Sequence, residues 1–213
     1  MRDQEQAQSV EPVRGGSGFN RRDFLKGSGA AMAATALATA PEAAQAKEKA
    51  SVAPAAPSPV TLNVNGHEHK LKLEPRVTLL DALRNDLSLT GCKDVCDSTN
   101  CGACTVLIDG KPTYACAVSV HGVQGKKITT VEGLVKGEQV DAAIKAFVKH
   151  DATQCGYCTP GFVVAVRGFC DKHPGATLDD VLKGLGGNLC RCGTYAGVAQ
   201  AALECAGSAK GGA

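Results

Sequence analysis

The chain has 213 residues and a formal net charge of +2, from 23 Lys and Arg against 21 Asp and Glu, and this length allows one or two domains. Its eight Phe and Tyr residues are not gathered among basic ones, which argues against a groove for nucleic acid. No apolar run reaches the ~20 residues that span a bilayer, so we expect no stable membrane insertion. The eleven cysteines are an odd number, so they cannot all form intramolecular disulfides, and their close spacing indicates metal ligands.

Residues 1–46 have the pattern of a twin-arginine signal peptide. The basic segment NRRDFLK at 20–26 precedes an uncharged run of small residues at 27–40, and AQA at 44–46 offers a cleavage site. The alternative is an Ala-rich tail with an accidental Arg pair. Because the twin-arginine route exports folded proteins, a cofactor inserted in the reducing cytoplasm would reach the periplasm already enclosed. The Ala- and Pro-rich residues 47–59 are interpreted as a linker.

Residues 60–136 are predicted to form a small α+β domain. Alternating apolar residues on both sides of an Asn-Gly pair at 65–66 predict a β-hairpin. Thr78 and Asp81 form the capping box of a short helix. Further strands are expected at residues 105–108, 114–120 and 128–131, with a turn at 109–110.

Residues 137–207 are predicted to form a four-helix bundle, because the apolar periodicity becomes helical there. The apolar face of its first helix is assigned to Val140, Ile144, Phe147 and Val148. The other three helices are expected to begin near Thr159, Thr177 and Tyr195. Residues 208–213 are expected to be a flexible tail. Neither domain has a large core, so the cysteines are expected to act as staples.

The first cysteine set is Cys96, Cys101, Cys104 and Cys116. Its C-x4-C-x2-C spacing is that of the plant-type [2Fe–2S] ligands, in which a loop wraps the cluster and a fourth thiolate arrives from elsewhere in the fold. Gly102 leaves room for backbone N–H groups to point at the sulfurs. Zinc is the alternative, but it more naturally takes two separate close pairs.

The second set is Cys155, Cys158, Cys190 and Cys192. Each of its two pairs lies at a predicted helix boundary, so the two loops could converge on one cofactor. The alternative for the first pair, a thioredoxin-like dithiol, requires a βαβ context and leaves the second pair unexplained. Three cysteines remain: Cys92 is expected to pack under the first loop, and Cys170 and Cys205 are expected to be buried on helix faces, with a disulfide between them as the less favoured possibility.

Three segments resemble a known family: GCKDVCDSTNCGACTV, QCGYCTPG and GNLCRCGTY. They are similar to the iron–sulfur subunit of the molybdenum hydroxylases, the family of xanthine oxidase and aldehyde oxidoreductase. The resemblance spans about residues 60–206. Val95 and Thr99 stand where this family often has Gly.

This resemblance implies a β-grasp, ferredoxin-like domain followed by a four-helix domain, each with one [2Fe–2S] cluster. It implies that electrons pass from molybdenum on a large partner subunit to the helical-domain cluster, then to the ferredoxin-like cluster, and on to FAD of a medium subunit or to a cytochrome c. By similarity, Gln154 and Cys192 would lie near the molybdopterin of the large subunit. No catalytic residue is assigned to this chain, because it has no room for a molybdenum domain.

Within this family, a small subunit with its own export signal resembles that of the periplasmic aldehyde oxidoreductases, and this resemblance implies an enzyme that oxidises aldehydes to carboxylic acids. Two alternatives remain open: a subunit acting on N-heterocycles such as isoquinoline, and a free-standing periplasmic ferredoxin. The helical domain argues against the free carrier, which needs only the first domain. A fixed subunit should also present apolar surface when isolated.

Overall fold

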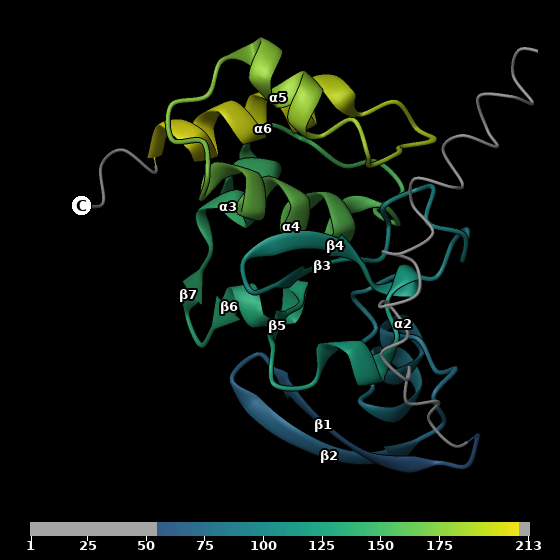
Figure 1. The fold of residues 1–213 in the computed structure, drawn as a ribbon. Coiled ribbons are helices and arrows are strands. Elements are labelled where there is room, and N and C mark those ends of the chain that lie inside the picture. Colours follow the sequence, from purple (N-terminus) through teal and green to yellow (C-terminus); the bar gives the residue numbers. More distant parts are fainter. Residues whose placement is uncertain (1–54, 209–213) are drawn as a thin grey trace, which may run out of the picture. The chain divides into compact units, whose positions relative to one another are not determined.

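The structure is a computed structural model that describes residues 55–208 (Figure 1). The expected signal peptide, residues 47–54 of the linker and residues 209–213 of the tail lie outside the described residues. None of the helices within 55–208 is long and apolar enough to cross a membrane.

A five-stranded mixed sheet forms the first domain, with strand order β2-β1-β5-β3-β4. β1 and β5 are parallel at its centre and the other neighbours are antiparallel, which confirms the β-grasp expectation. The strands are β1 (Ser58–Val64), β2 (His67–Leu73), β3 (Thr105–Ile108), β4 (Lys111–Tyr114) and β5 (Lys127–Thr129). β1 thus begins two residues inside the stretch interpreted as linker. Buried side chains of β1, β3 and β5 form the core together with those of the helix at 79–86.

Two tight turns set the register of the sheet. Asn65 and Gly66 both have positive φ, 54° and 87°, and join β1 to β2 as the Asn-Gly pair predicts. Asp109 and Gly110, with φ of 50° and 73°, make the same kind of turn between β3 and β4. Pairing therefore starts immediately at Lys111, and the return strand predicted over 114–120 was wrong: the chain leaves the sheet after Tyr114.

The capping box of Thr78 and Asp81 is confirmed. It starts α2 (Leu79–Asp81), which continues as one wide turn, η1 (Ala82–Asp86). Short 3-10 turns occupy much of the remaining connections: η2 (Ala115–Ala117), η3 (Val120–Val123) and η4 (Val131–Leu134). The strand predicted to end at 131 therefore ends at Thr129.

Four helices form the second domain, as expected, and α6 packs against the other three. They are α3 (Ala142–Lys149), α4 (Thr159–Cys170), α5 (Leu178–Gly184) and α6 (Tyr195–Ser208). A small hairpin of β6 (Val135–Lys136) and β7 (Gln139–Val140) joins the domains and spans the boundary expected at 136–137. α4 lies along β3 and β4, so the helical domain is packed directly on the sheet (Figure 1).

The apolar face assigned to the first helix needs correction. Val140 lies in β7, before the helix begins, and Val148 is 78% exposed. The buried face of α3 consists of Ala143, Ala146 and Phe147. Small alanines let α3 approach α6 closely, and a simple count of large apolar residues does not find them.

Candidate metal centres

The first cysteine loop, residues 91–104, contains no helix or strand and is fixed by polar side chains of neighbouring elements. Arg84 donates to the carbonyls of Thr90 at 3.1 Å and Cys92 at 2.9 Å. Glu132 accepts from the backbone N–H of Gly91 at 2.8 Å. These bonds replace the regular backbone pairing that the loop lacks.

The four thiols of the first set lie together as two pairs. The Cys96 and Cys101 side chains are hydrogen-bonded to each other, and so are those of Cys104 and Cys116. Cys116 comes from η2, directly after β4, so the turn at the end of the sheet supplies the fourth thiol. The sequence expectation that a loop and a neighbouring element converge agrees with this geometry.

Backbone N–H groups point at the exposed end of this set. Those of Ser98, Asn100 and Cys101 donate to the Cys96 sulfur and, together with the Cys101 thiol, lower the pKa of Cys96 to about 6. At the inner end, burial raises the pKa of Cys104 to about 12. The outer thiol is thus ready to ionise, whereas the inner one needs a positive charge such as a metal to hold it as thiolate.

Several residues of the loop adopt the left-handed backbone conformation, which allows the N–H groups to reach the sulfurs. Gly102 has φ of 71°, and a Cβ there would lie 2.7 Å from the Asn188 side chain and 2.8 Å from the carbonyl of Gly187. Asp97 and Thr99 also have left-handed backbones, with φ of 45° and 63°. A β-branched residue at positive φ is strained.

The second set also forms two pairs. Cys155 contacts Cys192, and Cys158 contacts Cys190. One member of each pair precedes α4 and the other precedes α6, so the predicted convergence of two helix-flanking loops is observed. The first of these pairs is exposed, and Cys190 of the other is buried.

Polar groups are directed at the second set as well. Although burial opposes it, hydrogen bonds from the hydroxyl and backbone N–H of Thr194 and from the Cys158 thiol lower the pKa of Cys190 to about 7. Burial, followed by the Cys190 thiol, raises the pKa of Cys158 to about 12. The backbone N–H of Tyr157 lowers the pKa of Cys155.

Across residues 55–208, no three His, Cys, Asp or Glu side chains gather as the ligands of a single ion. Each of the two sets instead consists of two pairs of thiols. A [2Fe–2S] cluster needs two thiolates on each of its two irons, and N–H groups aimed at sulfur suit anionic ligands. The residues present therefore fit this group.

The three remaining cysteines lie outside these sets. Cys92 is buried under the first loop, and its thiol donates to the carbonyl of Cys104 at 3.2 Å. Cys170 and Cys205 are buried in the helical core as free, hydrogen-bonded thiols, so they are buried as predicted and are not joined by a disulfide.

The exposed end of the second set carries the residue expected to lie near a partner's cofactor. Gln154 is exposed next to Cys155, and Cys192 is exposed as well. Large side chains close in sequence to the cysteines of this set are also exposed, with Tyr157 at 51%, Leu189 at 53% and Tyr195 at 44%. Exposed apolar groups of this size beside a functional site are typical of a protein interface.

Four polar residues that organise the site were not found from the sequence: Arg84, Glu132, Asn188 and Thr194. The only local signal is the position of the last two beside the CRC segment. Arg84 and Glu132 bind the loop from elements that are distant in sequence, so spacing cannot identify them.

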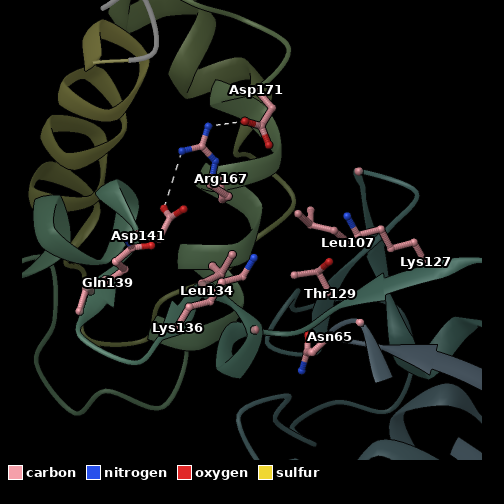
Figure 2. Close-up of a pocket in the computed structure, with 14 residues that line it drawn as sticks. Asn65, Leu107, Lys127, Thr129, Leu134, Lys136, Gln139, Asp141, Arg167 and Asp171 are labelled. Atoms are coloured by element: carbon pink, nitrogen blue, oxygen red, sulfur yellow. Dashed lines mark hydrogen bonds and ion pairs between the residues drawn. The ribbon is translucent and has the colours of Figure 1, made fainter. Parts of the chain in front are cut away.

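A separate cavity of about 730 Å³ lies away from the cysteines, between β5, the β6–β7 hairpin and α4 (Figure 2). Arg167 lies there between Asp171 and Asp141, with 3.7 Å to the latter. None of the residues that line it is a cysteine. It therefore does not belong to either cysteine set.

Three family models match the chain. A 2Fe-2S iron-sulfur cluster binding domain matches residues 62–129, and a [2Fe-2S] binding domain matches residues 130–203. A twin-arginine translocation pathway signal sequence matches residues 18–38 and indicates export.

Proteins of similar sequence are subunits of oxidoreductases. A probable xanthine dehydrogenase subunit of Bacillus subtilis (strain 168) is 42% identical over 130 residues, covering 61% of this chain and 75% of that protein. The aldehyde oxidoreductase iron-sulfur-binding subunit PaoA of Escherichia coli (strain K12) is 39% identical over 155 residues, which cover 66% of this chain and 68% of that protein.

Among solved structures, a chain of quinoline 2-oxidoreductase from Pseudomonas putida 86 is similar with a TM-score of 0.70 and 37% identity. The match covers 73% of this chain and 98% of that one. Nearly the whole of that neighbouring chain thus corresponds to the described part of this protein.

Proposed function

Because this chain belongs to the family of iron–sulfur subunits of the molybdenum hydroxylases, we propose that its eight paired cysteines are the ligands of its two [2Fe–2S] clusters. The first set is assigned to the ferredoxin-like domain, residues 60–136, and the second to the helical domain, residues 137–207. The observation that carries this assignment is the arrangement of both sets as two thiol pairs.

The protein contributes position and electrostatics to this function. When bound, the clusters supply one-electron transfer. The N–H groups around Cys96 and Cys190 stabilise thiolates, and burial of Cys104 and Cys158 keeps water from the inner ends. Hydrogen bonding and burial of this kind tune the reduction potential of a cluster.

The proposed reaction of the whole enzyme is oxidation of aldehydes to carboxylic acids. Support comes from the similarity to an aldehyde oxidoreductase subunit and from the export signal. Oxidation of an aldehyde with water releases two electrons and two protons, and this chain would carry the electrons one at a time. An N-heterocycle is the second candidate substrate, favoured by the likeness to quinoline 2-oxidoreductase.

The proposed partner is a large subunit with the molybdenum cofactor, seated on the exposed end of the second set. The apolar side chains of Tyr157, Leu189 and Tyr195 support this assignment, because a partner would remove them from water. Gln154 and Cys192 would then face the molybdopterin. A medium FAD subunit, or a cytochrome c, is the proposed acceptor of electrons from the first set.

The proposed location is the periplasm, reached in folded form after cleavage of residues 1–46. Replacing Arg21 and Arg22 by Lys is expected to keep the precursor in the cytoplasm, because the pathway reads the paired arginines. Immunoblots of periplasmic and cytoplasmic fractions measure this. Unchanged export of the double variant would contradict the proposal.

Cysteine variants test the ligand assignment in the complex purified from periplasm. Cys192→Ser is expected to remove or alter the signal of one cluster in electron paramagnetic resonance (EPR) and to leave the other. Cys92→Ser is the matched control. It removes a thiol that lies near the first set but belongs to neither cysteine set, so both EPR signals should remain. Two intact signals in Cys192→Ser would refute the assignment.

The same purification decides between subunit and free carrier. We expect a tagged chain to bring down a large subunit containing molybdenum and a flavoprotein, detected by mass spectrometry and by Mo and flavin analysis. A chain that comes down alone, with iron for two clusters and no molybdenum, would establish the free carrier instead. A cytochrome in place of the flavoprotein would identify the acceptor and leave the chemistry unchanged.

A further inference from the structure

Residues 187–189, which lead directly into the CRC segment, are bonded to the first cysteine loop. The backbone N–H of Leu189 donates to the carbonyl of Cys101 at 2.9 Å. The side-chain amide of Asn188 donates to the carbonyl of Gly102 at 2.8 Å and to the hydroxyl of Thr105 at 3.2 Å. The segment that carries one cysteine set is therefore bonded to the segment that carries the other.

Close backbone packing surrounds these bonds. Tyr114 donates to the carbonyl of Gly187 at 2.6 Å, and a Cβ on Gly187 would lie 2.2 Å from the Tyr114 oxygen. At Gly161, the start of α4, a Cβ would lie 2.5 Å from the carbonyl of Gly102. Glycines at these places let the main chains of the two domains touch, so the contact has little freedom to shift.

Asn188 is the polar side chain at the centre of this contact. It is 6% exposed, and its amide group is the donor in both side-chain bonds. If that amide is removed, the Gly102 carbonyl still accepts from the backbone N–H of Thr105 at 3.1 Å and from its hydroxyl at 2.6 Å. What is lost is the pair of side-chain bonds that ties residue 188 to the first cysteine loop. The contact would then loosen where the two cysteine sets approach each other.

We propose that Asn188 is a positioning residue that fixes the separation of the two cysteine sets, and so controls how fast an electron crosses between the clusters. The proposal rests on the proposed function, because it requires a cluster in each set. Electron transfer and magnetic interaction between two centres both depend on their separation.

The test compares three variants of the full chain in its purified complex. Asn188→Ala removes both side-chain bonds. Tyr114→Phe removes only the bond to residue 187 and is the milder change. Val60→Ala is the control, because Val60 is 1% exposed in the core of the first domain and lies on β1, which makes none of these bonds.

Two readouts are needed besides turnover: the splitting of the EPR signals when both clusters are reduced, and the rate of electron transfer between clusters after rapid reduction. We expect Asn188→Ala to keep both clusters, to show a weakened or broadened splitting, and to transfer electrons between the clusters more slowly than the wild type. Tyr114→Phe should change the EPR splitting and the transfer rate in the same direction as Asn188→Ala, but by a smaller amount. Val60→Ala should lower the unfolding temperature and change neither readout.

Wild-type splitting and rate in Asn188→Ala would overturn the proposal. If Asn188→Ala does not assemble, unchanged readouts in Tyr114→Phe overturn it. Equal changes in Val60→Ala would also overturn it, because a general loss of stability would then be the cause. Failure of the proposed function is recognised separately, in the wild-type complex, by less than about four iron atoms per chain.

Discussion

Thr99 holds a backbone conformation that its side chain opposes, and replacing it tests how the first cysteine loop is built. Its φ is 63°, its side chain is exposed, and it lies between the first two cysteines of the set. Thr99→Gly removes the Cβ that crowds this conformation. We expect the variant to be more stable than the wild type.

The size of the effect follows from two opposing contributions. A left-handed conformation costs a residue with a Cβ roughly 1–2 kcal/mol. Glycine also increases the conformational freedom of the unfolded chain, and this lowers the stability of the folded state by about 0.4–1 kcal/mol. The net gain is about 0.5–1 kcal/mol, which raises the unfolding temperature by about 1–4 °C in a protein of this size.

The assay is thermal unfolding of the cluster-loaded protein at one scan rate, followed by visible absorbance and far-ultraviolet circular dichroism. Ser98→Gly is the matched control: it lies in the same loop without a positive φ, so it should only lose stability. The two variants are therefore expected to shift in opposite directions. A decrease of similar size in both would refute the reasoning that strain at residue 99 is relieved.

Two further predictions concern the helical domain. Gly161→Ala should cost about 1–3 kcal/mol of stability, because its Cβ would lie 2.5 Å from a backbone carbonyl. Gly122→Ala, which meets nothing within 4 Å, should stay within about 0.5 kcal/mol; calorimetry of both checks this, and equal losses would contradict it. Hydrogen bonds from Lys149 and His150 lower the pKa of Glu204 in the folded state. Its contribution to stability is therefore present above the ordinary glutamate pKa of about 4.3 and is lost as the pH falls through the lower, folded pKa. The difference between wild type and Glu204→Gln, from urea unfolding, should accordingly shrink on acidification, and a difference that grows would contradict it.

The features that could be predicted from the sequence are those specified by a few adjacent residues. The Asn65-Gly66 turn needs positive φ at both positions, and this residue pair tolerates it. The capping boxes at Thr78 and Thr177 satisfy backbone N–H groups within four residues. The close cysteine groups at 96–104, 155–158 and 190–192 are equally local and can be picked out before any fold is known. Joining the last two groups into one set depended on the expected convergence of two loops, since 31 residues separate Cys158 from Cys190.

The features that were missed depend on contacts distant in sequence. Asn188 bonds to Gly102, 86 residues away, and no spacing rule connects them. Val148 fits the helical period but faces solvent, because the face that packs on α6 is defined by the neighbouring alanines. The strand after the Asp109-Gly110 turn was placed too late, because strong β-formers at 118 and 120 outweighed the register that the turn imposes.

The parallel pairing of β1 with β5 has a consequence for the order in which a growing chain can fold. Asn63 pairs with Lys127, so the edge of β1 that β5 covers stays unpaired on the ribosome until the whole first cysteine set has been synthesised. The sheet therefore closes around a loop that is already complete. α4 can pack on β3 and β4 earlier, but residues 187–189 and α6 emerge last. The bonds from residues 187–189 to the first cysteine loop and the packing of α6 on the other three helices therefore form only when translation is nearly finished. A prematurely terminated chain would carry a closed sheet beside an incomplete helical domain.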